Sequence, residues 1–384
     1  MRVGLNLLVG LSLLIPACAR PVDLENQDLP RPALGGATCG GSTIAQGATA
    51  LPSEWTGAAT SQSDPPTSVL FSAPSQEDST ATALYVVNAD GNRRREIVHG
   101  FFDAEDPAVS PNGRLVAFVR QSASLEHPDL MIASIDGSNL RILYQAVDYV
   151  NSVSWSPDSR RIAFLADGWV RTGKVDGDDR ARLIAEVHDD TADVATDDVG
   201  WSPDGSAIAF VDGGWVDGHW LGFPTLTLVA PDGSRRRELV TTTGSFAWSP
   251  TSDALAFTNR GISIVPAGGG KLKHLVATPE GTGVTNLSWS PDGRSIVFES
   301  GENLAVVQLC RLSIDGDTLT ELADCVPLFS GQEVSKDSRT LTFVQSTGTD
   351  CEHSPENRIM AVPLAGGAVK GLAEPGGSPQ WLPG

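Results

Sequence analysis

Three aspartates and a nearby aromatic loop carry side chains that could hold a ligand. The aspartates are Asp189, Asp190 and Asp193, and the loop carries Trp215, His219, Trp220 and Phe223. Carboxylate oxygens are the ligands that Ca²⁺ prefers, and tryptophan faces supply stacking or anchoring surface for a peptide or a glycan. The pattern predicts a recognition site in which the carboxylates could hold Ca²⁺, and it implies no other cofactor.

A structural alternative accounts for the same residues. The tryptophans could cover one end of a structural unit while the acids are solvated, because the aspartates lack the spacing of an EF-hand loop. The sequence contains neither a Gly-x-Ser-x-Gly nucleophile motif nor a phosphate-binding Gly-x-x-x-x-Gly-Lys-Ser/Thr loop. No catalytic residue is therefore assigned, and the identity of any metal is left open.

The elements that would position these side chains come from a repeat. A turn of the type Trp-Ser-Pro-Asp-Gly, or a degenerate form of it, begins at positions 109, 155, 201, 248, 289 and 334. In all six copies a phenylalanine ends the next apolar segment nine residues later. Proline presets φ, aspartate caps the turn and glycine accepts positive φ, so each copy predicts a hairpin turn between two strands. Steps of 41 to 47 residues indicate a repeat array.

Each unit has a second turn of the type Asp-Gly or Gly-Gly. Asp136-Gly137 and Asp232-Gly233 are examples, and each lies between two apolar segments. Asp-Gly between apolar runs is a strong hairpin signal. Each unit therefore predicts four antiparallel strands, named a to d here, which form one blade of a β-propeller.

The ends of the chain predict how many blades there are. Val69-Leu70-Phe71 occupies the phenylalanine position of a unit that has no strand a before it, while Ser378-Pro379-Gln380-Trp381 is a strand a with nothing after it. The two half-units complete one blade and close the ring, which removes exposed sheet edges. The expected fold is all-β, a seven-bladed propeller of four-stranded antiparallel blades. A solenoid is the structural alternative, and the complementary ends argue against it.

These motifs resemble a known family. Turns such as Trp201-Ser202-Pro203-Asp204-Gly205, followed by Ile208-Ala209-Phe210, and the stretch from Asp232 to Arg237 are similar to the TolB-type, WD-repeat-like propeller repeats of bacterial envelope proteins, over about residues 66–384. The resemblance implies a propeller that serves as an interaction scaffold, as a substrate gate of prolyl oligopeptidase-like enzymes or, occasionally, as a lyase. TolB itself has six blades and an N-terminal α/β domain, which residues 19–65 are too short to supply.

The N-terminus predicts export. Arg2 precedes an apolar run that is too short to span a bilayer, as in a secretory signal peptide over residues 1–17. The segment ending at Cys18 resembles a lipobox, which predicts acylation of that cysteine and a lipid anchor. Cleavage after Ala17-Cys18-Ala19, an Ala-x-Ala site, is the alternative and would release a soluble periplasmic protein. Residues 18–65 are rich in small residues and predict a flexible tether ahead of the propeller at 66–384.

Charge and cysteine content agree with export. A net charge of −20 argues against a nucleic-acid partner. Apart from Cys18, the cysteines are Cys39, Cys310, Cys325 and Cys351, which in an oxidising compartment are candidates for disulfides. Proximity in sequence favours Cys310 with Cys325, leaving Cys39 with Cys351, and free thiols are the alternative.

The intervals of the repeat predict where function lies. The a–b and c–d turns share one face of a propeller and are nearly constant, whereas the b–c connections on the other face vary in length. The loop from Trp215 to Phe223 and the link containing Asp189 belong to that variable face. We expect an exported, monomeric binding or scaffolding module for an envelope protein or cell-wall component, held at a membrane only through its lipid. The alternative is a hydrolase or lyase acting on a glycan or small molecule in the central channel.

Overall fold

The computed structural model describes part of the chain, and every structural statement below concerns that part. The described residues are 38–39, 42–44, 67–76, 81–101, 103–121, 127–146, 149–176, 182–186, 199–213, 215–216, 219–220, 224–242, 244–279, 282–301, 306–314, 318–327, 331–346 and 357–383. All regular elements among them are strands.

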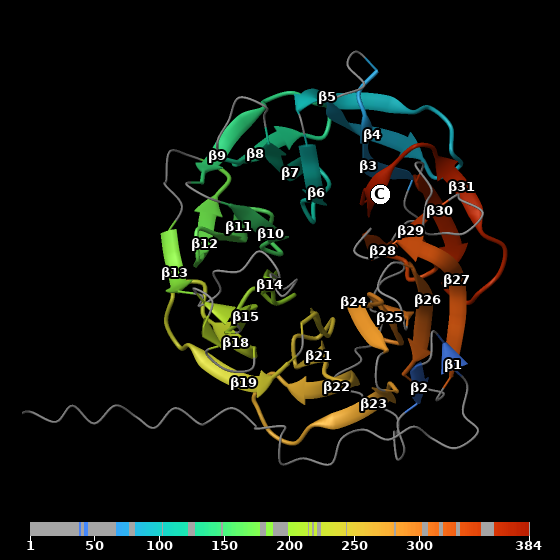
Figure 1. Ribbon diagram of the computed structural model, residues 1–384. Helices are drawn as coiled ribbons and strands as arrows, with labels where there is room; N and C mark the ends of the chain where they lie inside the picture. Colours follow the sequence, from blue (N-terminus) through green and yellow to red (C-terminus); the bar gives the residue numbers. More distant parts are fainter. Residues whose placement is uncertain are drawn as a thin grey trace, which may run out of the picture.

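Seven four-stranded antiparallel blades form a ring, with strand a of each blade innermost (Figure 1). Blade 1 holds β32 (Gly377–Trp381), β3 (Ser68–Pro74), β4 (Thr82–Asn88) and β5 (Arg95–Phe101), and blade 2 holds β6 (Asp103–Val109), β7 (Leu115–Gln121), β8 (Asp129–Ser134) and β9 (Arg141–Gln145). Blade 3 holds β10 (Val150–Trp155), β11 (Arg161–Ala166), β12 (Trp169–Lys174) and β13 (Arg182–Glu186), and blade 4 holds β14 (Val199–Trp201), β15 (Ile208–Asp212), β18 (Thr225–Val229) and β19 (Arg237–Thr241). Blade 5 holds β20 (Phe246–Trp248), β21 (Ala254–Thr258), β22 (Gly261–Pro266) and β23 (Lys273–Ala277), and blade 6 holds β24 (Gly283–Trp289), β25 (Ser295–Gly301), β26 (Val306–Ser313) and β27 (Leu319–Pro327). Blade 7 holds β28 (Gln332–Val334), β29 (Thr340–Ser346), β30 (Asn357–Pro363) and β31 (Lys370–Ala373).

The ring closes as the sequence predicts. The C-terminal β32 pairs with β3, with Val69 opposite Trp381 and Leu70 opposite Gln380. Strand a of blade 1 therefore comes from one end of the chain and strands b to d from the other. The expected all-β fold of seven blades is confirmed.

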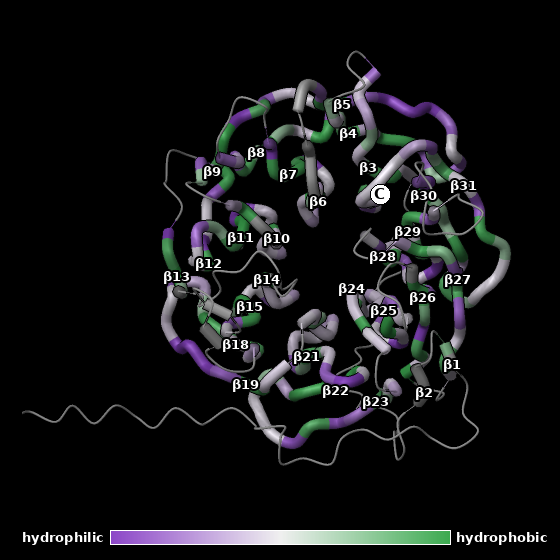
Figure 2. The backbone as a smooth tube through the Cα atoms, viewed as in Figure 1, coloured by the Kyte–Doolittle hydropathy of each residue, from purple (hydrophilic) through white to green (hydrophobic). Residues whose placement is uncertain are grey.

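The repeated phenylalanines pack between blades. Six of them, Phe71, Phe118, Phe164, Phe257, Phe298 and Phe343, have no exposed surface, and Phe210 is 2% exposed. Each lies in strand b, where apolar residues alternate toward the two neighbouring blades, and Figure 2 shows hydrophobic segments in such strands as β11 and β15. Burial of one such side chain contributes about 1.5–3 kcal/mol, so the phenylalanine position is explained by packing alone.

A short N-terminal hairpin adds to blade 5. β1 (Thr38–Cys39) pairs with β2 (Ser42–Ile44), and β2 pairs with the outer edge of β23, where Thr43 is opposite Ala277. The tether expected over residues 18–65 is thus interrupted by an ordered hairpin, and the remainder of that segment lies outside the described residues. An exposed strand edge offers unpaired backbone groups, which is why an extended segment can attach there.

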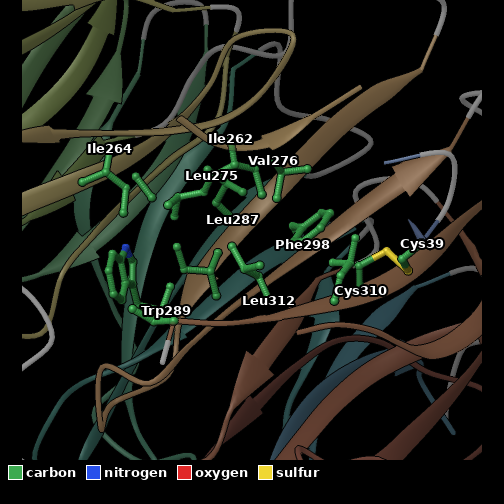
Figure 3. Close-up of a cluster of buried hydrophobic side chains, with 14 of the residues drawn as sticks. Cys39, Ile262, Ile264, Leu275, Val276, Leu287, Trp289, Phe298, Cys310 and Leu312 are labelled. Atoms are coloured by element: carbon green, nitrogen blue, oxygen red, sulfur yellow. A yellow bond between two sulfur atoms is a disulfide. The ribbon is translucent and has the colours of Figure 1, made fainter. Parts of the chain in front are cut away.

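The disulfide pairing expected from proximity in sequence is wrong. Cys39 is bonded to Cys310 of blade 6, in the buried cluster that joins blades 5 and 6 (Figure 3). Cys325 is not the ladder partner of Cys310: that partner is Glu321, and Cys325 falls between Ala323, which pairs with Leu309, and Val326, which pairs with Val307. Because Cys310 is bonded to Cys39, it cannot bond to Cys325. Cys325 is itself disulfide-bonded, and Cys351 lies outside the described residues.

Within the described part of the chain, no helix has the length and apolar character needed to cross a bilayer. The predicted signal peptide and Cys18 are outside that part.

Candidate functional site

The aromatic loop of blade 4 contains a hairpin of its own. β16 (Trp215–Val216) and β17 (His219–Trp220) pair with each other, with Trp215 opposite Trp220, and form a two-stranded sheet separate from the blade. The hairpin lies in the connection between strands b and c. It is therefore an insertion on the face where the sequence predicted variation.

The base of this insertion is fixed by the blade. The insertion leaves and re-enters the sheet at Asp212 and Thr225, which are ladder partners. The Asp212 carboxylate forms an ion pair with Arg236, and the Arg236 guanidinium lies 5.5 Å from the centre of the Phe210 ring. The two ends of this connection are therefore held in one ladder.

The candidate residues meet different outcomes. Trp215, His219 and Trp220 belong to the hairpin. Phe223, Asp189, Asp190 and Asp193 lie outside the described residues, so the expected meeting of carboxylates and aromatics stays a prediction. Among the described residues, no group of three His, Cys, Asp or Glu side chains is arranged to hold a metal ion.

The aspartates of the a–b turns are engaged in the turns themselves. The Ser156 hydroxyl donates to Oδ1 of Asp158 at 2.6 Å, and the backbone N–H of Arg160 donates to the same oxygen at 3.0 Å. The hydrogen bond from Ser156 is the main cause that lowers the pKa of Asp158. The same serine–aspartate bond recurs in blades 4, 6 and 7. These carboxylates stabilise the hairpins rather than a ligand.

The last turn position alternates between glycine and serine around the ring, as Gly113, Ser159, Gly205, Ser252, Gly293 and Ser338. Each of these serines accepts a backbone N–H from the turn of the preceding blade. The bonds run from Asn112 to Ser159 (3.1 Å), from Asp204 to Ser252 (3.0 Å) and from Asp292 to Ser338 (2.9 Å). At two of the glycines a proline ring takes this space: a Cβ on Gly205 would be 3.2 Å from Pro157, and one on Gly113 would be 3.0 Å from Pro383.

The tryptophans follow the same alternation. The indole N–H of Trp155 donates to the Ala108 carbonyl at 2.9 Å, and that of Trp248 donates to the Gly200 carbonyl at 3.0 Å. These bonds join blades 2 and 3 and blades 4 and 5. Within the described part of the chain, the indole nitrogens of Trp201, Trp289 and Trp381 are buried without a partner. The ring thus has two kinds of seam between blades.

Basic residues at the start of strand d join neighbouring blades on the face that carries the a–b and c–d turns. Arg141 donates to the Val175 carbonyl, Arg182 to that of Asp232 at 3.0 Å, and Arg237 to that of Gly268 at 3.0 Å. Lys370 does the same to Ala89 at 3.2 Å, from blade 7 to blade 1. The basic side chains of the repeat therefore act as clamps between blades.

Two buried carboxyls lie near the inner strands of blades 6 and 7. Glu299 is fully buried and accepts hydrogen bonds from Asn286 (3.0 Å) and Thr285 (3.3 Å). Glu333, on β28, accepts the backbone N–H of Trp381 at the closing seam. Burial of its carboxyl raises the pKa of Glu333 to about 8, although that hydrogen bond and the charge of Lys336 oppose the shift.

Sequence reasoning did not find Glu333. The repeat does mark it as an exception. The residue before the tryptophan position is small in five units and is a glutamate only in the sixth; the five small residues are Ala108, Ser154, Gly200, Ala247 and Ser288. Ser154 shows what the position does: its hydroxyl accepts the N–H of Trp201 at 2.9 Å. Glu333 makes the corresponding contact with Trp381, but with an ionisable group.

The geometry defines a seven-bladed β-propeller with an inserted aromatic hairpin, and comparison with known proteins agrees with the fold. No family model matches the chain, and no curated protein matches it in sequence. Among solved structures, TolB from Acinetobacter baumannii is similar, with a TM-score of 0.52, 15% identity and coverage of 79% of each chain.

Two enzymes are also similar in structure. The periplasmic gluconolactonase of Pseudomonas aeruginosa gives a TM-score of 0.56 at 14% identity, over 82% of this chain and 99% of that one. A prolyl endopeptidase gives 0.57 at 14% identity, over 85% of this chain and 50% of that one. At such identities the likeness establishes the fold, and function must be argued from this chain's own residues.

Proposed function

We propose that the protein is an exported binding scaffold that recognises an envelope protein or a cell-wall component through the hairpin of blade 4. The observation that carries the proposal is the insertion of β16 and β17, which brings Trp215 opposite Trp220 on a base fixed by Asp212 and Arg236. Aromatic residues on a rigid support are the usual anchors of protein interfaces. Asp189, Asp190 and Asp193, in the preceding link, would extend this surface and supply carboxylates for Ca²⁺.

Export is supported by the disulfide chemistry. Cys39 and Cys310 are bonded, and Cys325 is bonded as well. Disulfides persist in oxidising compartments such as the bacterial periplasm. The proposed maturation is cleavage before Cys18 with acylation of that residue, and the likeness to TolB and to a periplasmic gluconolactonase supports the same compartment.

An experiment on the hairpin tests the scaffold role. Full-length protein and a Trp215→Ser/Trp220→Ser double variant are used to isolate partners from envelope extracts, with Val369→Ser in blade 7 as the control for loss of an exposed apolar side chain. The double variant is expected to lose a partner that the control retains. Identical partners for all three proteins would contradict the role of the hairpin.

A second candidate function is catalysis at the inner strands. Glu333 carries a carboxyl whose pKa of about 8 suits a general acid at neutral pH, and the likeness to a gluconolactonase makes a glycan-derived or other small substrate reasonable. Its contact with Trp381 gives it a structural task as well. Turnover of lactone and glycan substrates that disappears in Glu333→Gln, with an unchanged fold, would favour this alternative over the scaffold.

A further inference from the structure

One position on the outer strand of each blade can be compared around the whole ring. We call it the rim position: it is the residue of strand d that pairs with the middle of strand c. The pairs, strand c first, are Tyr85–Glu96, Met131–Ile142, Arg171–Leu183, Thr227–Glu238, Ser263–His274, Cys310–Glu321 and Met360–Gly371. Blades 1, 4 and 6 therefore have glutamate at the rim, and blade 5 has histidine.

Blades 2 and 3 depart from this pattern. Their rim residues, Ile142 and Leu183, are apolar and are 43% and 47% exposed. Together with Leu140, just before β9, they are three of the four exposed large hydrophobic residues in the described part of the chain, the fourth being Val369. Charged residues on outer strands prevent other chains from pairing there. At the rim position itself, two neighbouring blades carry an apolar side chain instead.

The groove between blades 5 and 6 shows what can occupy such an edge. β2 adds to β23 of blade 5, while Cys39 of β1 reaches into blade 6 and bonds to Cys310, the strand c partner of the rim residue Glu321 (Figure 3). Cys39 is only 2% exposed in this place. A two-stranded hairpin thus lies along one blade, and its outer strand puts a side chain against the rim pair of the next.

The groove between blades 2 and 3 is the equivalent place three seams earlier in strand order. β9 corresponds to β23, and the pair Arg171–Leu183 corresponds to Cys310–Glu321. Figure 1 shows β9 and β13 as neighbouring outer strands, and within the described residues no strand pairs with the outer edge of β9. The floor of the groove is ordered, because the Arg171 guanidinium lies 4.8 Å from the centre of the Tyr144 ring.

A cavity of about 530 Å³ lies at the c–d turn end of this groove. It is lined by Leu115, Ser134, Asn139, Leu140, Arg141, Val175 and Asp176, which come from blades 2 and 3. Arg141 crosses it to the Val175 carbonyl. An added strand would have room for a side chain here on one of its faces, while Leu140 and Ile142 offer apolar surface to the other.

We propose that a β-hairpin of a partner protein adds to β9, between blades 2 and 3, so that its inner strand pairs with β9 and its outer strand places an apolar side chain against Leu183. Backbone hydrogen bonds to the edge would give affinity, and the groove would select apolar side chains at alternate positions. This inference rests on the proposed scaffold function and names the chemistry of one class of partner, a polypeptide with an exposed β-hairpin, at a surface distinct from the hairpin of blade 4.

The test uses β-hairpin peptides with randomised strand residues, displayed on phage and selected on the full-length protein. Selected peptides are synthesised, and their affinity is measured by fluorescence anisotropy for the wild type, for Leu183→Glu, which restores the residue of blades 1, 4 and 6, and for Val369→Glu as the control. We expect alternating apolar residues in the peptides and an affinity about tenfold or more lower for Leu183→Glu, because a carboxylate would be desolvated on binding. Val369→Glu should bind as the wild type does.

Hydrogen exchange of the wild type gives a readout that does not depend on any variant. The amides of β9 should exchange more slowly with peptide bound, and those of β31 should not change. Failure to select any peptide, equal affinity for Leu183→Glu, or protection elsewhere than at β9 would each overturn the proposal. If the Trp215→Ser/Trp220→Ser variant nevertheless loses an envelope partner, the scaffold function stands and only this surface is wrong.

Discussion

Glu333 gives the ring a predicted dependence on pH. A carboxyl with an ordinary pKa of 4.5 is raised to about 8 in the folded protein. The folded state then holds a proton that the unfolded state releases between these values, so stability is fully present below pH 4.5 and is lost as the pH rises through about 8. Replacement by glutamine, which keeps the shape and does not ionise, should remove this dependence.

The size of the effect follows from the shift. With 1.36 kcal/mol per pH unit, the raised pKa costs about 1 kcal/mol at pH 5 and about 3 kcal/mol at pH 7, a difference of roughly 2–3 kcal/mol. For a ring of this size such a change corresponds to about 4 °C in the midpoint of thermal unfolding. Between pH 5 and pH 7 the wild type should therefore lose about 4 °C relative to Glu333→Gln.

Calorimetry or circular dichroism over pH 5 to 8 measures this difference. Glu238→Gln, at an exposed position of blade 4, controls for the loss of a surface carboxylate. Lys336→Met should extend the loss of stability to higher pH, since the charge of Lys336 opposes the shift at Glu333. Parallel curves for the wild type and Glu333→Gln across the whole range would refute the reasoning, because they would mean that the carboxyl titrates alike in both states.

Three further predictions concern the ring itself. Cys39→Ser should destabilise the protein by about 3–5 kcal/mol, because the Cys39–Cys310 bond closes a loop of 271 residues; under reducing conditions the unfolding midpoints of the wild type and the variant should become equal, and an unchanged difference between them would contradict the pairing. Trp155→Phe should cost about 1–2 kcal/mol more than Trp201→Phe, since only Trp155 loses an indole hydrogen bond; denaturant unfolding measures both, and equal losses would show that the two kinds of seam do not differ in energy. Gly137→Ala should destabilise the protein by about 3 kcal/mol or more, because the new Cβ would be 2.0 Å from the Ile97 carbonyl oxygen. Gly366→Ala is the control, since Gly366 has a similar φ of 87° and no atom within 4 Å of such a Cβ, and it should cost only about 1 kcal/mol. Similar unfolding midpoints for the two variants would contradict the close contact between blades 1 and 2.

The site was harder to predict than the fold. The insertion between Asp212 and Thr225 was visible in the sequence as a long b–c connection, and the structure places a hairpin there. Its proximity to Asp189 and Asp190 depends on loops whose course no local pattern dictates. Glu333 was visible only as an exception within one column of the repeat, and its meaning required knowing that the column faces the next blade.

The sequence alone determined the blades, their number and the closure of the ring. Turn residues act locally: proline, aspartate and glycine set the backbone of each hairpin, and the nine-residue interval fixes the register from each turn to its buried phenylalanine. Tertiary structure alone decided which cysteine meets Cys39, where the N-terminal hairpin attaches, and which indoles find an acceptor. Those outcomes depend on distances between residues of different blades. Because the repeat makes the blades alike in sequence, it contains little information about which strand edge is covered by another segment and which, like that of β9, is left open.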